Sequence, residues 1–321
     1  MRKIGILTSG GDAPGMNACI RAVTRYAIQK GLEVYGIEQG YLGLLENKLN
    51  LMNKRSVSDI IQRGGTMLKT ARCAEFKERD VMQQAVDTLE AYGIEGLVVI
   101  GGDGSFRGAK DLYTMFGVKT IGIPGTIDND LPYTDFTLGF DTTVNTVLSA
   151  INNLRDTMTS HDRVCIIEVM GRKCGDIALY SGIGGGAEII LVPEVPFDIN
   201  RVVKDIKKNQ RLGKTSDIIV LAEGVCKAED LKQQLKDCGV TNSIKTTTLG
   251  YIQRGGAPSM QDRIFAAQFG VRAVDLLLAD KGGRVVGTKN NEVVDCDIEE
   301  ALAVPRRFNK TLYDTANILG S

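Results

Sequence analysis

The chain has 321 residues, of which 43% are hydrophobic and 24% are charged, and its 39 basic residues balance its 39 acidic ones. This is the composition of an ordinary globular protein, and the length suggests about two domains. The balanced charge gives no electrostatic reason to expect a nucleic-acid partner or an anionic membrane.

Short apolar strands alternate with amphipathic helices along the whole chain. In chain order, strands are predicted at 3–8, 33–37, 96–100, 119–123, 163–169, 187–192, 217–222 and 284–287. Helices are predicted near 16–29, 78–92, 105–115, 141–158, 175–183, 198–211, 227–237, 260–279 and 309–319. Such alternation predicts an α/β fold with parallel sheets and right-handed crossovers.

Three features point to a cytoplasmic protein that does not enter a membrane. No apolar run approaches the roughly 20 residues that span a bilayer. The N-terminus passes directly into strand-like sequence, so we expect no signal peptide. The seven cysteines are scattered without a C-x-x-C pair, which suits reduced thiols.

The only histidine is His161, in the segment SHDR, which reads as a loop. We expect a structural or orienting role for it. A histidine-cluster zinc site is therefore excluded, and a general base has to come from a carboxylate.

The first glycine-rich loop follows the predicted strand 3–8. The order is KIGILT, then SGGDAPG, then a helix from about Met16. The spaced GK[ST] ending of a P-loop is absent, and so is the G-x-G-x-x-G dinucleotide motif.

A second glycine loop, GGDGS at 101–105, follows the apolar run GLVVI. Glycine backbone can approach an anion closely, and the first turn of a helix from Ser105 would direct its free N–H groups at the loop. Asp103 lies among these glycines, which makes sense if a Mg²⁺ ion lies between the carboxylate and a phosphate. A GGDG sequence alone is a weak signal and is often only a turn.

The most informative stretch is PGTIDND, from Pro124 to Asp130. Asp128, Asn129 and Asp130 come directly after an apolar strand, and open α/β sheets bind ligands at the carboxyl ends of their strands. Because a buried unpaired carboxylate is costly, the cluster is best used to accept a proton or to hold a metal. A solvated turn with an Asx cap is the alternative.

Six motifs together are far more specific than any one of them. SGGDAPGMNA, RGGTMLKTAR, GGDGS, PGTIDND, EVMGRKCGD and GYIQRGG occur in the order and spacing of the bacterial ATP-dependent 6-phosphofructokinases, which the chain resembles from Ile4 to about Asp297. The resemblance implies two Rossmann-like three-layer αβα lobes with mainly parallel sheets and the active site in the cleft between them. The large ATP-binding lobe would comprise 1–138 and 250–304, and the smaller sugar-phosphate-binding lobe 139–249 and 305–321.

The resemblance also implies the reaction. Such an enzyme phosphorylates D-fructose 6-phosphate at its 1-hydroxyl, giving fructose 1,6-bisphosphate and ADP in the committing step of glycolysis. Asp128 would be the general base. Thr126 and Arg172 would contact the transferring phosphoryl group, and Asp130 would support the base and metal region.

For the nucleotide, the resemblance assigns ATP as donor and Mg²⁺ as cofactor. The implied contacts are Gly11, Arg72, Cys73, Gly102, Asp103, Gly104 and Ser105, with Asp103 as the metal ligand. Pyrophosphate-using relatives carry aspartate at the position of Gly104 and lysine at that of Gly125. Glycine at both positions leaves room for the α-phosphate of ATP.

For the sugar phosphate, the implied contacts within one subunit are Thr126, Ile127, Asp128, Met170, Gly171, Arg172, Glu223, Tyr251, Ile252, Gln253 and Arg254. Arg163 and Lys245 would reach in from a neighbouring subunit to the 6-phosphate, so a homotetramer is expected. The family usually has arginine at the position of Lys245 and histidine at that of Tyr251. Both departures bear on substrate affinity.

An effector pocket at a subunit interface, for ADP as activator and phosphoenolpyruvate as inhibitor, is implied as well. Its residues would be Arg21, Ala22, Val23, Thr24, Arg25, Lys54, Arg55, Ser56, Val57, Ser58, Asp59, Arg155, Gly186, Ala187, Glu188, Leu212, Lys214, Thr215 and Ser216. Arg21 and Arg25 alone would read as a solvated helix face. The family often has arginine at position 54 and a basic residue at position 212, so Arg55 or Arg211 would have to compensate.

Three alternatives stay open. A pyrophosphate-dependent relative is disfavoured by Gly104 and Gly125. Lipid and NAD kinases share a GGDG loop but lack the MGR and IQRGG elements. A non-catalytic nucleotide-binding homologue would be expected to lose Asp128 or Asp103, and both are present.

Overall fold

The structure is a computed structural model that describes residues 1–214, 216–306 and 308–320. The chain forms two compact units, Met1–Thr142 with Arg254–Arg306 (unit 1) and Thr143–Gln253 with Arg307–Ser321 (unit 2). Among the described residues, no helix is both long and apolar enough to cross a membrane. Thr215, expected in the effector pocket, lies outside the described residues.

Unit 1 is built on a sheet with the strand order β11-β10-β5-β4-β1-β2-β3. The strands are β1 (Lys3–Thr8), β2 (Glu33–Ile37), β3 (Leu49–Met52), β4 (Gly96–Gly101), β5 (Lys119–Pro124), β10 (Arg284–Lys289) and β11 (Glu292–Asp297). The inner strands run parallel, and the two edge strands β3 and β11 pair antiparallel. The carboxyl ends of β1, β4 and β5 therefore meet at one edge.

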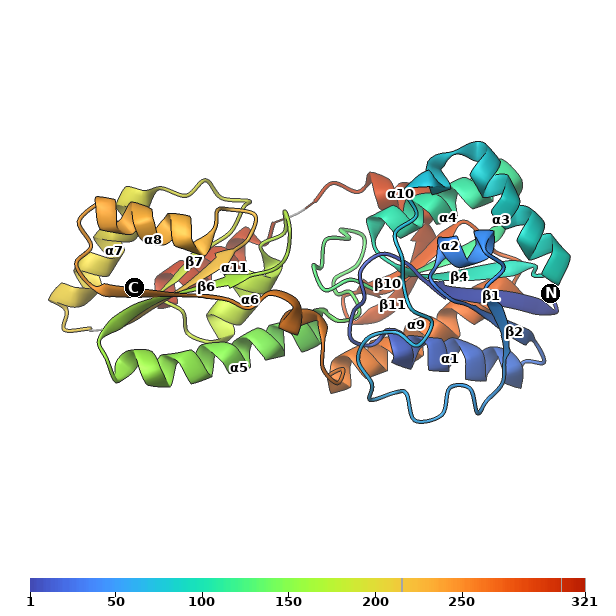
Figure 1. Ribbon diagram of the computed structural model, residues 1–321, viewed down its shortest axis with the longest axis horizontal. Helices are drawn as coiled ribbons and strands as arrows, with labels where there is room; N and C mark the ends of the chain where they lie inside the picture. The colour runs from blue at the N-terminus through green and yellow to red at the C-terminus, as the bar shows by residue number, and fades with distance from the viewer. Residues whose placement is uncertain (215, 307, 321) are drawn as a thin grey trace. The chain divides into compact units, whose positions relative to one another are not determined.

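Helices cover both faces of this sheet (Figure 1). One face carries α1 (Met16–Gln29) and α9 (Met260–Leu278). The other carries α2 (Tyr41–Leu45), α3 (Arg79–Tyr92), α4 (Asp103–Phe116) and α10 (Ile298–Ala303), with the 3₁₀ turn η1 (Ala74–Lys77). A Cβ on Gly270 would lie 2.8 Å from the Cβ of Ala22, so glycine permits the close approach of α9 to α1.

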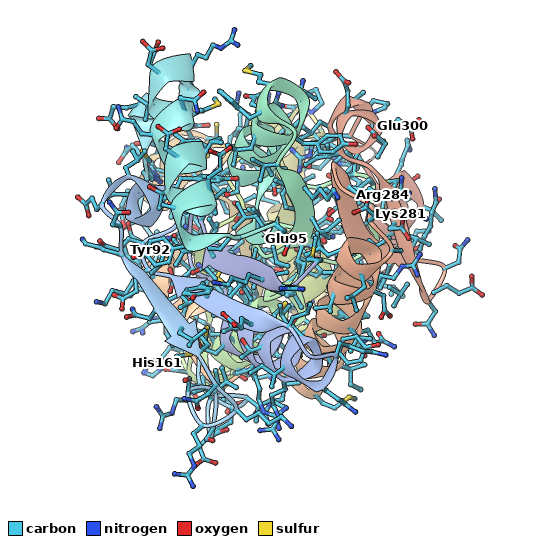
Figure 2. The ribbon with its side chains drawn as sticks, turned by 90° about the vertical axis from the view of Figure 1, so that its right-hand side faces the viewer. Tyr92, Glu95, His161, Lys281, Arg284 and Glu300 are labelled. Carbon is cyan, nitrogen blue, oxygen red and sulfur yellow. The ribbon has the colours of Figure 1, made fainter. Side chains whose placement is uncertain are left out.

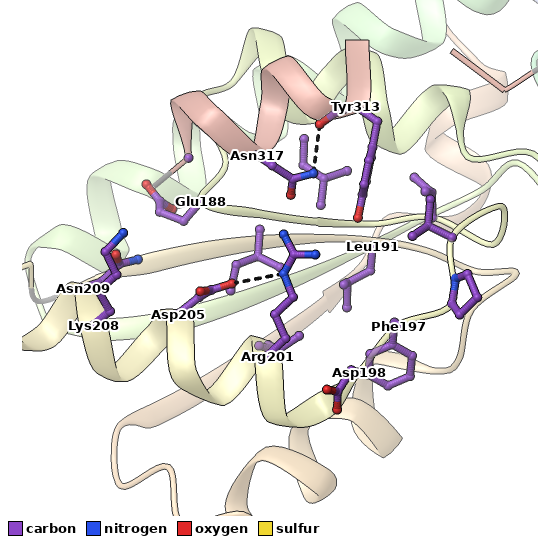
Figure 3. Close-up of a pocket in the computed structure, with 17 residues that line it drawn as sticks. Glu188, Leu191, Phe197, Asp198, Arg201, Asp205, Lys208, Asn209, Tyr313 and Asn317 are labelled. Carbon is purple, nitrogen blue, oxygen red and sulfur yellow. Dashed lines mark hydrogen bonds and ion pairs between the residues drawn. The ribbon is translucent and has the colours of Figure 1, made fainter. Parts of the chain in front are cut away.

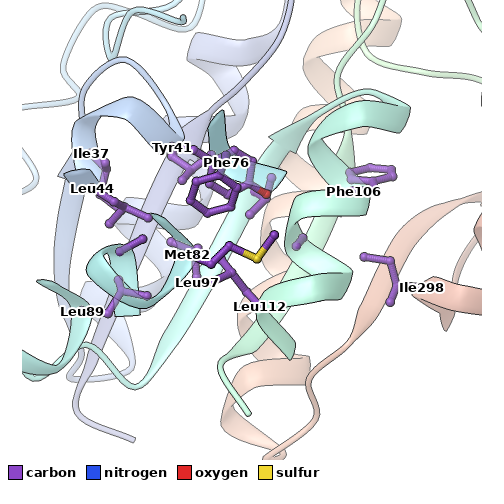
Figure 4. Close-up of a cluster of buried hydrophobic side chains, with 14 of the residues drawn as sticks. Ile37, Tyr41, Leu44, Phe76, Met82, Leu89, Leu97, Phe106, Leu112 and Ile298 are labelled. Carbon is purple, nitrogen blue, oxygen red and sulfur yellow. The ribbon is translucent and has the colours of Figure 1, made fainter. Parts of the chain in front are cut away.

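A hydrophobic core of unit 1 lies between its sheet and the α2–α4 face (Figure 4). Met82, Leu89 and Leu97 are buried there, and the rings of Tyr41 and Phe76 stack with centroids 4.1 Å apart. Burial of such side chains stabilises the fold by roughly 1.5–3 kcal/mol each relative to exposure. This packing fixes the helices whose first turns follow the strand ends.

Unit 2 has a smaller, wholly parallel sheet with the order β7-β8-β6-β9. Its strands are β6 (Arg163–Val169), β7 (Ile189–Leu191), β8 (Asp217–Ala222) and β9 (Ser243–Thr248). Helices α7 (Ile199–Arg211) and α8 (Ala228–Asp237) cover one face, and α5 (Phe140–Thr159) and α6 (Asp176–Gly184) cover the other (Figure 1). The unit is completed by α11 (Lys310–Leu319), while the 3₁₀ turn η2 (Gly250–Arg254) leads back to unit 1.

The prediction of an α/β fold with mostly parallel sheets is confirmed. Several short elements were not predicted, namely α2, β3, β9, β11 and α10. One boundary matters for function: α4 begins at Asp103 and not at Ser105. Asp103 is therefore in the first turn of a helix and not in the glycine loop before it.

Candidate functional site

Three of the predicted loops leave neighbouring strands at the same edge of the unit 1 sheet. Thr8 pairs with Ile100, and Gly101 pairs with Pro124. Beyond the strands, the Ser9 N–H donates to the Ile100 carbonyl at 3.0 Å. The Gly125 N–H donates to the Gly101 carbonyl at 2.9 Å. The loops after β1, β4 and β5 thus form one continuous surface.

The loop after β4 has the construction of a phosphate cradle. Gly102 is the N-cap of α4 and offers no side-chain cap. The Ser105 N–H donates to the Gly102 carbonyl at 3.0 Å, so the N–H groups of Asp103 and Gly104 are the ones that face another acceptor. A Cβ on Gly101 would lie 2.5 Å from the Ser105 Oγ, so packing explains that glycine. A Cβ on Gly104 would meet nothing within 4 Å. Packing therefore does not explain Gly104, and the space that a side chain would occupy there is open.

Asp103 is the one expected metal ligand. Its carboxylate accepts two hydrogen bonds from Arg107, one turn further along α4. Among the described residues there is no group of three or more His, Cys, Asp or Glu side chains that could hold a metal by themselves. One carboxylate at a phosphate cradle nevertheless fits Mg²⁺, which commonly takes one or two carboxylates together with phosphate oxygens and water.

The loop after β5 divides its three polar residues between two tasks. Asp128 is buried, and its N–H donates to the Thr126 Oγ1 at 3.2 Å. Asn129 has a positive φ of 51°, and its side-chain oxygen accepts the Thr137 N–H at 3.1 Å. The Thr137 hydroxyl in turn donates to the Thr126 carbonyl at 2.6 Å. Asn129 therefore closes the loop between the two carboxylates.

Arg254 lies over the loop after β1. A Cβ on Gly11 would be 2.6 Å from the Arg254 Nη2, so a side chain there would displace this guanidinium. The Arg254 Nη1 is 3.9 Å from the Asp12 carboxylate. A Cβ on Gly64 would lie 2.3 Å from the Gly256 carbonyl. The two RGG segments of the sequence are thus in contact within unit 1.

The segment that carries Arg72 and Cys73 is held by residues that the sequence did not single out. The buried Asn17 side chain donates to the carbonyls of Arg63 and Gly64 at 3.2 and 3.0 Å, and it accepts a hydrogen bond from Met67 N–H at 2.7 Å. Thr8 and Thr70 add hydrogen bonds between this segment and the end of β1. The sequence signal for this contact was the amide Asn17 among the apolar positions of α1.

Within that segment, Arg72 is exposed and Cys73 is partly buried against the core. Burial is the main cause that raises the pKa of the Cys73 thiol. Cys73 is therefore a neutral apolar contact at neutral pH and not a nucleophile.

In unit 2, the MGR segment follows β6 and Glu223 follows the neighbouring β8. The Arg172 N–H donates to the Glu223 carboxylate at 2.9 Å, and the Glu223 N–H donates to the Val169 carbonyl at 2.9 Å. A Cβ on Gly171 would lie 2.3 Å from the Cys174 carbonyl, and its φ is 133°. The tight turn therefore requires glycine and presents Arg172 beside Glu223.

The other residues expected at the sugar phosphate differ in exposure. Ile127 and Gln253 are buried, and the Gln253 side chain accepts the Met170 N–H at 3.1 Å. Tyr251 and Ile252 are 80% and 60% exposed. Gln253 thus positions the MGR turn, while Tyr251 and Ile252 lie at the solvent-exposed surface.

Arg163 and Lys245 lie at the opposite end of the unit 2 sheet. Arg163 begins β6, and Lys245 pairs with Cys165 on the edge strand β9. Strand alternation places both on the face away from the cluster under α7 and α8. The other six residues of β6 separate Arg163 from the MGR turn, a span of about 20 Å. One subunit therefore does not bring these two cations to Arg172 and Glu223.

The family is decided by comparison with known proteins. The family model described as phosphofructokinase matches residues 3–277. The chain belongs to the phosphofructokinase family. The expected resemblance to the bacterial ATP-dependent enzymes is confirmed, and so is the expectation of a kinase.

Full-length relatives are close to this phosphofructokinase in sequence. The ATP-dependent 6-phosphofructokinase of Clostridium acetobutylicum is 59% identical, and ATP-dependent 6-phosphofructokinase 1 of Clostridium perfringens is 56% identical, each over 99% of both chains. The phosphofructokinase structure from Saccharomyces cerevisiae has a TM-score of 0.87 at 32% identity and covers 99% of this chain. This chain spans 47% of the yeast chain.

A pyrophosphate-dependent phosphofructokinase from Marinobacter aquaeolei has a TM-score of 0.84 at 23% identity, and it covers 94% of this chain. At this sequence identity the likeness shows a shared fold and nothing further. It therefore leaves the identity of the phosphoryl donor to the residues of the cradle.

The residues expected in the effector pocket of this phosphofructokinase are divided between the two units. In unit 1, Arg25 is exposed on α1, whereas the side chains of Val23, Thr24 and Val57 are buried, so only their backbone can meet a ligand. The turn that carries 54–59 is otherwise largely exposed and is held by the Asn53 side chain.

In unit 2, Glu188 is the centre of a compact ionic group. Its carboxylate is almost fully buried, and it lies 3.2 Å from the Arg155 Nη1 and 2.8 Å from the Lys214 Nζ. Arg155 also donates to the carbonyls of Gly185 and Gly186. The exposed Leu212 brings no charge to this group.

A cavity of about 130 Å³ lies in unit 2 between β7, α7 and α11 (Figure 3). Figure 3 shows the Tyr313 ring and the Arg201 side chain at its wall. Of the residues expected to bind ligands, only Glu188 lines it. The cavity therefore does not mark the catalytic site of this phosphofructokinase.

His161 is exposed at the end of α5 (Figure 2). It lies in the turn that follows the helix, and its Nδ1 is 3.0 Å from the carbonyl of Thr157 in α5. The structural or orienting role expected for His161 stays a prediction.

Proposed function

We propose that this protein is an ATP-dependent 6-phosphofructokinase that transfers the γ-phosphoryl group of ATP to the 1-hydroxyl of fructose 6-phosphate. The products are fructose 1,6-bisphosphate and ADP, in the committing step of glycolysis in the cytoplasm. The observation that carries the proposal is the position of Asp128 beside the α4 cradle, on loops that leave adjacent strands. The names and identities of the clostridial relatives support it.

In this mechanism Asp128 accepts the proton of the attacking hydroxyl. The first turn of α4 binds phosphate oxygens through its N–H groups and the positive end of its dipole. Thr126 and Arg172 contact the transferring group, and the guanidinium stabilises the charge that it carries in the transition state. Asp130 supports the base, and Asp103 would hold Mg²⁺, which neutralises phosphate charge when it is bound.

ATP is proposed as the donor because of the two glycines. The empty space around Gly104 accommodates the α-phosphate of a nucleotide. At Gly125, a Cβ would lie 2.8 Å from the Ile100 Cγ2 and 3.1 Å from the Met16 Cε. The lysine found there in pyrophosphate-using relatives would therefore require the Ile100 and Met16 side chains to move. Both positions favour ATP.

The sugar phosphate is proposed to bind in unit 2 beside Arg172 and Glu223, whose carboxylate accepts hydrogen bonds. Arg163 and Lys245 are proposed to bind the 6-phosphate of a neighbouring subunit in a homotetramer. Their distance from the MGR turn along β6 supports this assignment. Each active site would then need two copies of the chain.

Allosteric control by ADP and phosphoenolpyruvate is proposed at Arg21, Arg25, the 54–59 turn and the group around Glu188. The exposed cations of the first unit and the Arg155 and Lys214 pair of the second provide charge for anionic effectors. Leu212 contributes none, so a weaker effector response is expected than in relatives with a basic residue there.

A coupled assay with fructose 6-phosphate tests the proposal, with ATP and pyrophosphate compared as donors. We expect turnover with ATP and Mg²⁺ and little with pyrophosphate. Asp103→Ala should weaken the use of Mg·ATP and change the Mg²⁺ dependence, because the cradle loses its metal ligand. A preference for pyrophosphate would overturn the donor assignment.

A further inference from the structure

Both oxygens of the Asp103 carboxylate are held by one side chain. Arg107 lies four residues further along α4, on the same face of the helix. Its Nε donates to Oδ2 at 2.9 Å, and its Nη2 donates to Oδ1 at 3.1 Å. The contact uses the planar fork of the guanidinium. The side chains of Arg107 and Asp103 are 61% and 47% exposed, so a ligand in solution can reach the pair.

This contact places a fixed positive charge on the carboxylate that is proposed to bind the metal. Two cations that share one carboxylate repel each other, so Arg107 competes with a metal ion for Asp103. In the absence of metal, the same guanidinium cancels the negative charge that Asp103 would otherwise present to a polyphosphate. Arg107 therefore weakens the binding of a metal ion at Asp103 and strengthens the binding of metal-free nucleotide phosphates.

We propose that Arg107 is the internal counter-ion of Asp103, a positioning residue that keeps the cradle neutral until the metal–nucleotide complex arrives. When the complex binds, Arg107 releases Asp103, and phosphate oxygens become the acceptors that its fork fits. The inference rests on the proposed function, because it takes the nucleotide phosphates to bind beside Asp103. It predicts that Arg107 lowers the thermodynamic coupling between Mg²⁺ and ATP.

A purely structural role would have a different signature. An exposed ion pair four residues apart on a helix stabilises it only slightly, and it has no effect on a ligand. Arg201 and Asp205 on α7 are also an Arg–Asp pair of this spacing, with side chains 62% and 45% exposed. Arg201→Gln is therefore a matched control that removes the same charge away from the cradle.

The test measures the dissociation constant of ATP by titration calorimetry, once in chelator and once with saturating Mg²⁺. The coupling is the dissociation constant measured in chelator divided by the one measured with saturating Mg²⁺. Arg107→Gln should weaken metal-free ATP binding and raise this ratio about two- to fivefold, as expected for loss of a surface ion pair of about 0.5–1 kcal/mol. Arg107→Lys, which keeps the charge without the fork, should lie between it and the wild type. Arg201→Gln should leave the ratio unchanged.

Asp103→Asn distinguishes the counter-ion role of Arg107 from the metal-binding role of Asp103. It should lower the ratio, and adding Arg107→Gln to it should change the ratio no further. If Asp103→Asn lowers the ratio but Arg107→Gln alone does not raise it, the counter-ion role is refuted while the metal role of Asp103 stands. If Asp103→Asn leaves the ratio unchanged, Asp103 does not hold the metal, and both the proposed metal site and the counter-ion role fail.

Discussion

Gly104→Asp should separate ligand binding from folding. The position is in the first turn of α4, and a Cβ there meets nothing within 4 Å. Glycine in a helix costs about 0.5–1 kcal/mol relative to alanine, of which aspartate recovers only about 0.3 kcal/mol, and a negative charge in the first turn adds about 0.3–1 kcal/mol. The variant should therefore be as stable as the wild type, or more stable by about 1 kcal/mol.

ATP binding should change in the opposite direction. Two unit charges about 4 Å apart repel by about 1 kcal/mol in water and by about 4 kcal/mol at an effective dielectric constant of about 20. A carboxylate in the cradle should therefore raise the KM for ATP about tenfold to a hundredfold, a cost of about 1.4–2.7 kcal/mol. Thermal unfolding and a coupled assay at saturating fructose 6-phosphate measure the two effects.

Gly104→Asn is the matched control, because it has nearly the same shape without the charge. It should keep the KM for ATP within a few-fold of the wild type. The reasoning is refuted if Gly104→Asp unfolds like the wild type and keeps its KM for ATP. Equal losses in the aspartate and asparagine variants would instead show that space, and not charge, governs the position.

Three further predictions follow from named contacts. Asp128→Asn should leave both KM values nearly unchanged and lower kcat by about 10²–10⁴-fold, as for loss of a general base, and a near-normal kcat would remove Asp128 from that role. Lys245→Ala should raise the KM for fructose 6-phosphate about ten- to a hundredfold, through loss of a charge-assisted hydrogen bond worth about 1.5–3 kcal/mol, and leave that for ATP nearly unchanged. Hybrids of Lys245→Ala and Asp128→Asn subunits should recover activity that neither parent shows at low substrate. Burial raises the pKa of Asp262 from 3.8 to about 6. The folded state therefore holds this proton more tightly than the unfolded state, and the contribution of Asp262 to stability falls by about 3 kcal/mol as the pH rises from about 4 to 6. Denaturant titrations across this range should show a smaller decline for Asp262→Asn than for the wild type, and parallel curves would contradict the assignment.

The long alternating elements were predictable because their patterns are strong, whereas the missed elements have weak or mixed ones. β9 reads SIKTTT, a polar edge strand in which only Ile244 is buried. β11 reads EVVDCD and joins β10 through Asn290 and Asn291, both with positive φ. Two such residues between paired strands are typical of a type I′ hairpin, so the Asn-Asn pair was a usable signal for the antiparallel edge.

At the site, the motifs predicted which loops matter, but not how they are held. Asn17 binds the backbone of 63–67, nearly 50 residues away in sequence, and nothing local in either segment encodes that contact. Asn129 looked like a third polar ligand beside Asp128, yet its side chain closes the loop onto Thr137. Arg107 was not singled out by the sequence, and its contact with Asp103 depends on both residues lying on one face of α4. These roles depend on side-chain direction, which residue type and spacing do not determine.

The sugar-phosphate residues show why sequence spacing and spatial grouping have to be separated. Arg163 and Arg172 are nine positions apart, which in a loop would let both contact one small ligand. Here β6 lies between them, fully extended and paired on both sides, so their Cα atoms are held at opposite ends of one strand. Arg172 shares its end with Glu223, and Arg163 shares the other with Lys245. A single phosphorylated sugar is too short to bridge the about 20 Å of strand between the two pairs. If both pairs serve fructose 6-phosphate, they must therefore serve it from different copies of the chain, which is the condition that the hybrid experiment tests.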